Sequence, residues 1–71
     1  MSNQKLRVLG HLQQYGSITQ LEALQMYGIG RLAARIHELR YEGVNISKVM
    51  IEDLNRYGEV TRYAKYIYGG V

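Results

Sequence analysis

The sequence predicts a mainly helical α+β domain in which three short helices precede a C-terminal β-hairpin. Two observations carry this prediction. Apolar residues recur at helical spacing over residues 3–15, 19–27 and 30–42, and a glycine follows each of these segments. The pattern then changes, because residues 44–68 are rich in tyrosine and β-branched residues, which favour strands.

Size and composition indicate one folded domain over residues 1–71. A chain of 71 residues has room for one core, and its hydrophobic content of 46% is sufficient for folding. There is no cysteine, and His11 and His37 are far apart in the sequence, so we expect neither a metal nor a cofactor. No apolar run approaches the roughly 20 residues that span a bilayer, and the start lacks a signal peptide. We therefore expect a cytoplasmic protein without a membrane or small-molecule partner.

The first predicted helix covers residues 3–15. Its apolar stripe consists of Leu6, Leu9 and Leu12, with Val8 beside them. Ser2 or Asn3 is placed to cap the start, and Gly16 follows the last turn as a left-handed C-terminal residue does. The next two residues, Ser17-Ile18, are sufficient only for a minimal strand at a sheet edge, with the isoleucine pointing inward.

The second predicted helix covers residues 19–27 and begins with a capping box. Thr19 is a good N-cap residue, and Glu22 stands three positions later. Ile18 and Ala23 occupy the positions that pack together as a hydrophobic staple. The buried stripe of this helix is predicted to consist of Leu21, Leu24 and Met26.

A short break, Gly28-Ile29-Gly30, separates the second helix from the third. Its first glycine supplies a left-handed residue at no steric cost, and its isoleucine is expected to point into the core. The third helix then covers residues 30–42 and ends at Gly43. Its predicted buried face consists of Leu32, Ile36 and Leu39, and its opposite face of Arg31, Ala34, Glu38 and Tyr41.

Two strand-like runs form the predicted hairpin over residues 44–68. The inward-facing positions change parity between Ile46 and Val49, which a β-bulge explains. Asn55 and Gly58 are placed for the turn between the two strands. Three short helices on a two- or three-stranded sheet form the winged helix-turn-helix arrangement, in which the hairpin is the wing.

A resemblance supports this arrangement. The run SITQLEALQMYGIGRLAARIHELRYEGVNI resembles the small winged helix-turn-helix domains of phage and prophage proteins, with their G-S-I-T-x-x-E-A helix, Y-G-I turn and R-L-x-A-R-I-x-x-L helix. It covers residues 4–68 and is specific over residues 16–46. The resemblance implies double-stranded DNA as the partner. The role is then either transcriptional regulation or architectural recombination of the excisionase kind, in the host cytoplasm if the protein is phage-encoded.

The third helix carries the predicted base contacts, because in a helix-turn-helix the second helix lies in the major groove and its first residues reach the base edges. These residues are Gly30, Arg31, Ala34, Arg35 and Glu38. Arg31 is placed for a bidentate contact to guanine, and the small side chain of Ala34 permits close approach. Arg35 either contacts DNA or pairs with Glu22. Glu38 either accepts a hydrogen bond from cytosine or pairs with Arg35 or Arg31.

Phosphate contacts are predicted at helix starts and on the hairpin. The N–H of Gly30 and the side chains of Thr19 and Gln20 are placed for phosphate oxygens, although capping alone accounts for Thr19. At the hairpin tip, Arg56 and its neighbour Tyr57 suit a minor groove, whereas a solvated arginine paired with Asp53 or Glu59 is the alternative. The remaining candidates, which are phosphate contacts or plain basic surface, are Lys48, Arg62 and Lys65.

Other functions are less well supported. Glu52-Asp53 is the only adjacent acidic pair and has no histidine beside it, so we expect no enzyme. A net charge of +3 favours an anionic partner, but acidic residues beside the basic ones leave a protein-interaction module that binds or inhibits a host protein as the alternative. Self-association is predicted either through the tyrosine-rich last strand as a sheet edge or as cooperative binding along DNA.

Overall fold

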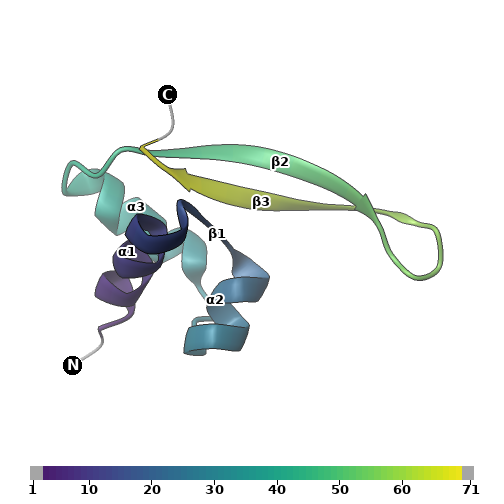
Figure 1. Ribbon diagram of the computed structural model, residues 1–71, viewed down its shortest axis with the longest axis horizontal. Helices are drawn as coiled ribbons and strands as arrows, with labels where there is room; N and C mark the ends of the chain where they lie inside the picture. Colours follow the sequence, from purple (N-terminus) through teal and green to yellow (C-terminus); the bar gives the residue numbers. More distant parts are fainter. Residues whose placement is uncertain (1–2, 70–71) are drawn as a thin grey trace.

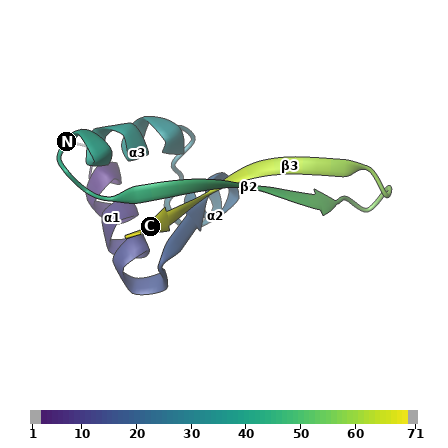
Figure 2. The same ribbon diagram turned by 90° about the horizontal axis from the view of Figure 1, so that it is seen from above.

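The computed structural model describes residues 3–69 and contains the predicted elements in the predicted order. The helices gather beneath one end of a sheet, and a long hairpin extends beyond them (Figure 1, Figure 2). The α+β fold with three helices and a hairpin is therefore confirmed. The helices are α1 (Gln4–Tyr15), α2 (Gln20–Tyr27) and α3 (Leu32–Tyr41), and the strands are β1 (Ser17–Thr19), β2 (Ile46–Leu54) and β3 (Val60–Tyr68).

Helix α1 buries a different face from the one that the leucine spacing predicts. Leu6 is 61% exposed, and Leu9 is only partly buried. The buried face consists of Val8, His11 and Leu12. The prediction was wrong at Leu6 because α1 packs against α3 and β1, and these neighbours lie on the side of Val8 and Leu12.

The ends of α1 follow the predicted local signals in part. Gly16 ends the helix with a left-handed φ of 84°, and its N–H donates to the carbonyl of Leu12. Asn3 is the N-cap residue, but its side chain makes no capping hydrogen bond. The other predicted cap, Ser2, lies outside the described residues.

Helix α2 is also rotated away from its predicted orientation. Leu21, Leu24 and Met26 are 62%, 53% and 53% exposed, so the predicted buried stripe was wrong. The buried side is instead marked by Ala23 and the partly buried Tyr27, which lie one turn apart. Because these two residues set the rotation of an eight-residue helix, the leucines point away from the core.

A buried histidine ties α1 to α2. His11 Nδ1 lies 2.7 Å from the Tyr27 hydroxyl, and the two rings meet edge to face at 5.5 Å. The His11 side chain is almost fully buried. This contact explains why α2 presents Tyr27 rather than its leucines to α1.

Tyr27→Phe is expected to lower the free energy of unfolding by about 1 kcal/mol, because it removes this hydrogen bond and keeps the ring. Urea denaturation followed by circular dichroism measures the change. Tyr15→Phe is the control, since its exposed side chain contacts His11 only through the ring. Equal losses in the two variants would contradict a stabilising role for the hydroxyl.

Strand β3 lies in the middle of the sheet. The strand order is β1-β3-β2, and both pairings are antiparallel. The predicted minimal strand after the first helix is confirmed, with Ile18 of β1 buried opposite Tyr66 of β3. Strand β1 covers the tyrosine-rich last strand only at residues 65–67, so this part of β3 is not a free edge as predicted, whereas residues 60–64 pair only with β2 among the described strands. The outer strands are β1 and β2.

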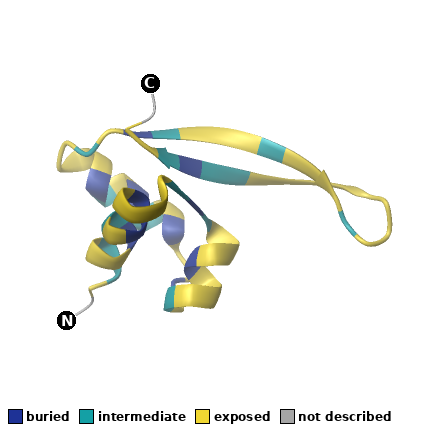
Figure 3. Cartoon of the chain, in the orientation of Figure 1, coloured by how far each residue is buried: buried dark blue, intermediate teal, exposed yellow. Residues whose placement is uncertain are grey.

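The hairpin contains no bulge. Its register is continuous from Ile46 opposite Tyr68 to Leu54 opposite Val60. Figure 3 shows buried residues in the helices, in β1 and at the base of the hairpin, whereas the outer hairpin is mostly exposed. The parity of the sequence pattern shifts because the outer hairpin leaves the core, so neither of its faces is buried.

The hairpin turn forms as predicted. Gly58 adopts a left-handed φ of 77°, and its N–H donates to the carbonyl of Asn55. The Asn55 side-chain oxygen accepts from the backbone N–H groups of Tyr57 and Glu59, at 2.8 and 3.0 Å. The turn thus holds Arg56 at the tip.

One core joins all of these elements. It consists of Val8, Leu12, Ile18, Ala23, Ile29, Leu32, Ile36, Leu39, Ile46 and Tyr66. The predicted buried face of α3 and the inward position of Ile29 are thereby confirmed.

Candidate nucleic-acid interface

The break between α2 and α3 is held from within by Gln20. Its side-chain Nε2 donates to the carbonyl of Ile29 at 2.7 Å, and its Oε1 accepts from the backbone N–H of Leu32 at 3.0 Å. Gly28 ends α2 with a left-handed φ of 68°, and its N–H donates to Leu24. The nitrogen and the oxygen of one side-chain amide therefore fix the geometry of the turn.

Helix α3 begins at Leu32, later than the sequence predicts. Arg31 is its N-cap residue and Gly30 precedes the cap. A guanidinium group has no acceptor and cannot cap a helix, so Gln20 supplies the missing acceptor for the first N–H. The exposed Arg31 side chain is thus not needed for capping and makes no ion pair within residues 3–69.

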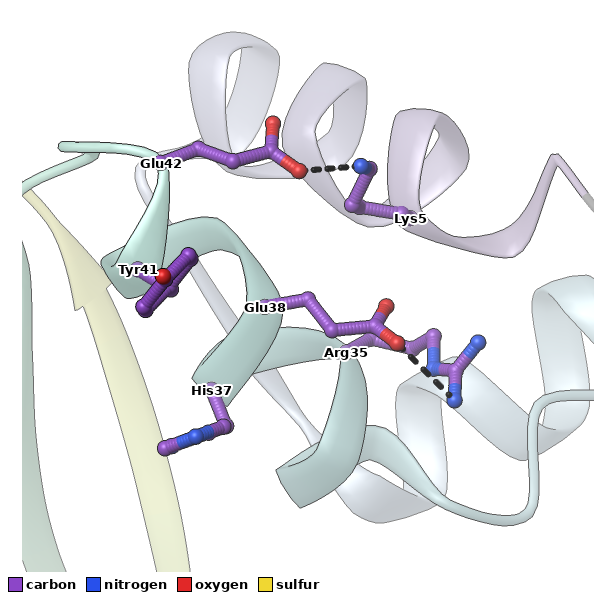
Figure 4. Close-up of a pocket in the computed structure, with 6 residues that line it drawn as sticks. All are labelled: Lys5, Arg35, His37, Glu38, Tyr41 and Glu42. Atoms are coloured by element: carbon purple, nitrogen blue, oxygen red, sulfur yellow. Dashed lines mark hydrogen bonds and ion pairs between the residues drawn. The ribbon is translucent and has the colours of Figure 1, made fainter.

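The exposed side of α3 carries paired charges. Figure 4 shows Arg35 beside Glu38 on this helix, with 3.5 Å between Nη2 and Oε2. It also shows Lys5, from α1, pointing to Glu42 at the end of α3, and these two side chains form an ion pair. Arg35 therefore pairs with Glu38 rather than with Glu22. The shallow pocket between α1 and α3 is lined by Lys5, Arg35, His37, Glu38, Tyr41 and Glu42.

The hairpin tip carries an unpaired arginine. Arg56 is exposed and makes no ion pair with any described residue, while Tyr57 beside it is 78% exposed. Asp53 and Glu59, the two acidic residues predicted as alternative partners of Arg56, form hydrogen bonds with other groups. Glu59 accepts from Asn55 Nδ2 at 3.1 Å, and the carboxylate of Asp53 accepts from the backbone N–H of Leu54 at 2.8 Å.

A comparison with known protein families agrees with this geometry. The model of a family described as winged helix-turn-helix domain matches residues 3–69. The chain belongs to this family. No curated protein and no solved structure matched. Winged helix-turn-helix domains are DNA-binding domains, with α3 in the position of the recognition helix and the β2–β3 hairpin in that of the wing.

The wing strands carry the remaining predicted contacts. Lys48 on β2 is exposed and lies opposite Tyr66. Arg62 on β3 lies opposite Glu52, with 3.6 Å between Nε and Oε2, and both side chains are well exposed. Such an exposed pair contributes little to stability, so either side chain can exchange its partner.

The polar side chains at the start of α2 form hydrogen bonds within the domain. Thr19 forms the predicted capping box, since its hydroxyl accepts from the N–H of Glu22 and its own N–H donates to the Glu22 carboxylate. Gln20 next to it holds the recognition-helix turn. Sequence reasoning missed this second role, because the partners of Gln20 lie nine and twelve residues further along the chain.

Arg40 has a structural role that the sequence pattern did not reveal. Its Nε donates to the carbonyl of Ile46 at 3.0 Å and so joins the end of the recognition helix to the start of the wing. Within residues 3–69 there is no group of three potential metal-ligating side chains, and no helix is long and apolar enough to cross a membrane.

Proposed function

We propose that this winged helix-turn-helix protein binds double-stranded DNA sequence-specifically, with α3 in the major groove and the wing tip at the minor groove. The observation that carries the proposal is the state of Arg31. It lies at the start of the recognition helix, its side chain is exposed, and the Gln20 amide holds the backbone on both sides of it, at the Ile29 carbonyl and the Leu32 N–H. A backbone held in this way needs little further ordering when the side chain that it presents binds DNA.

The residues of the recognition helix have different roles in this proposal. Arg31 makes the bidentate contact to guanine, and the small Ala34 allows the helix to approach the groove. The N–H of Gly30 donates to a phosphate oxygen. Arg35 and Glu38 enter the major groove as an ion pair. Glu38 orients the Arg35 guanidinium, and its negative charge weakens non-specific attraction to phosphates. Thr19 and Gln20 support this surface, and any phosphate contact they make is additional to their internal hydrogen bonds.

The wing supplies contacts that depend less on sequence. Arg56 inserts toward the minor groove, where a narrow groove concentrates negative potential, and Tyr57 packs on the sugar-phosphate backbone. Lys48 and Arg62 approach phosphates from the wing strands, and Arg62 exchanges Glu52 for a phosphate oxygen.

Replacing both arginines tests the proposal. Binding of wild type to random-sequence duplex DNA is followed by fluorescence anisotropy from roughly 50 to 200 mM salt, and affinity is expected to fall linearly on a log–log plot. The double variant Arg31→Ala/Arg56→Ala is expected to weaken binding. The slope of log affinity against log salt concentration is expected to become shallower, because two cations that release counterions from the DNA are lost.

Arg7→Ala is the control for net charge. Arg7 is exposed and lies about 200° around α1 from Lys5, the residue that faces α3, given 100° per helical residue. If its replacement raises the binding free energy by half as much as the double replacement does, only the total charge of the protein attracts DNA. Absence of binding by wild type at the lowest salt would favour the protein-interaction module instead.

The biological role follows from what binding does to DNA. A transcriptional regulator acts by occupancy, whereas an architectural recombination factor bends its site and binds cooperatively along tandem sites. Selection of a site from a random pool, followed by a circular-permutation bending assay, distinguishes the two roles. A sharp bend with cooperative binding supports recombination, and an unbent single site supports regulation.

A further inference from the structure

Strand β2 has a free edge along the outside of the sheet. It pairs only with β3 among the described strands, because the strand order is β1-β3-β2. Bonds at both ends of the hairpin show which groups face inward. Gly69 N–H donates to Asn45 and Asn55 N–H donates to Glu59, so the odd-numbered residues of β2 direct their backbone groups to β3. The even-numbered residues direct theirs to the free edge.

At the two ends of this edge, outward-directed backbone groups already have hydrogen-bond partners within the chain. The carbonyl of Ile46 accepts from Arg40, and the N–H of Leu54 donates to the Asp53 side chain. Between them lie the outward-directed backbone groups of three exposed residues, which are Lys48, Met50 and Glu52. An open stretch of this kind accepts another strand unless something prevents the pairing.

The open stretch is complementary to a second copy of itself. In an antiparallel pairing centred on Met50, Lys48 of each copy lies opposite Glu52 of the other, and Val49 lies opposite Ile51. The two lysine–glutamate pairs are related by a two-fold axis, as a closed dimer requires. Because Arg62 already pairs with Glu52, each glutamate would lie between two cations on neighbouring strands.

Other antiparallel registers leave these charges unmatched. The paired residues must both be even-numbered, since only those direct their backbone groups to the edge. A pairing centred on Lys48 or on Glu52 places like charges opposite each other, and a pairing centred one residue from Met50 places a charge opposite an apolar residue. Charge therefore selects the register centred on Met50.

We propose that two copies of this chain dimerise through their β2 edges, antiparallel about Met50, in a continuous sheet of order β1-β3-β2-β2-β3-β1. The outer hairpin gains most from this pairing. It is a two-stranded ribbon outside the core, and such ribbons are marginal in water. Pairing also covers Met50, which is 58% exposed, and Val49, which is 40% exposed. The dimer is proposed for the protein without DNA, since Lys48 and Arg62 pair in it with glutamates rather than with phosphates.

Charge reversal tests the pairing, with sedimentation equilibrium as the readout. Lys48→Glu and Glu52→Lys each place like charges opposite each other in a homodimer, so each variant alone is expected to dimerise roughly tenfold or more weakly than wild type. A 1:1 mixture restores both attractive pairs and is expected to dimerise as wild type does. Circular dichroism confirms that each variant is folded. A mixture no more associated than its components, or a wild type that stays monomeric up to its solubility limit, overturns the proposal.

Single cysteines test the register, because the chain has none of its own. Met50→Cys places two thiols across the two-fold axis with Cα atoms about 5.5 Å apart, within disulfide range. Leu54→Cys is the control, as it lies on the same edge with similar exposure, 64% against 58%, but about 27 Å from its mate at 3.4 Å per residue. Rapid oxidative cross-linking of the first variant alone supports the register, and equal rates at both positions overturn it.

Discussion

Leu32→Ala is expected to lower the free energy of unfolding by about 2–5 kcal/mol, the largest effect of any single substitution considered for this chain. Leu32 is fully buried at the start of α3, so truncation loses apolar burial and leaves a cavity. Small domains have a total stability of about 5 kcal/mol. The variant is therefore expected to be largely unfolded at moderate temperature, as thermal and urea denaturation followed by circular dichroism will measure.

Leu24→Ala is the matched control, because it makes the same change in the neighbouring helix. Leu24 is 53% exposed, so its truncation forms no cavity, and alanine is the better helix former. We expect a change within about 0.5 kcal/mol. A loss comparable to that of Leu32→Ala would mean that the leucines of α2 are buried after all, as the spacing of apolar residues alone predicts.

The contrast between these leucines shows what a sequence pattern can and cannot determine. Features fixed by neighbours in the chain were predicted correctly, including the Thr19–Glu22 capping box and the left-handed Gly16 and Gly28. The burial of Leu24 depends on how α2 is rotated, and a distant contact between His11 and Tyr27 sets that rotation. An eight-residue helix has too few turns for apolar spacing to define one buried side.

The sheet illustrates the same limit. Alternation and the content of tyrosine and β-branched residues identified the hairpin strands, but they could not show that β1 pairs with β3 and leaves β2 as an edge. Strand order depends on long-range pairing, about which residue spacing within one strand carries no information. The apparent bulge between Ile46 and Val49 was likewise a consequence of the hairpin leaving the core, which only the three-dimensional arrangement reveals.

The candidate interface was predicted to a similar extent. The Arg35–Glu38 pair follows from helical periodicity and is present. Arg31 is exposed as predicted, although it is the N-cap residue of α3 rather than part of the helix. The pair between Lys5 and Glu42 joins residues that are 37 positions apart, so no local pattern indicates it. The position of Gln20 at the start of α2 suggested a phosphate contact, whereas its amide is bonded to the turn before α3.

Gln20→Ala is expected to lower the free energy of unfolding by about 1–3 kcal/mol, because the Ile29 carbonyl and the Leu32 N–H lose their partners together. It should also weaken binding to random-sequence duplex DNA, because Arg31 is no longer held at the start of the recognition helix. The salt dependence should stay as in wild type, since no charge has been removed. Denaturation and anisotropy titrations of the same preparation measure both effects.

Gln25→Ala separates this role from the loss of a glutamine in general. Gln25 is exposed on the same helix, and its replacement should change neither stability nor affinity. The two measurements on Gln20→Ala then assign the role of the amide. A loss of both stability and affinity means that Gln20 acts on DNA through the turn that it holds. A loss of affinity at unchanged stability means that its amide contacts the phosphate itself, which is the role that the sequence alone predicts.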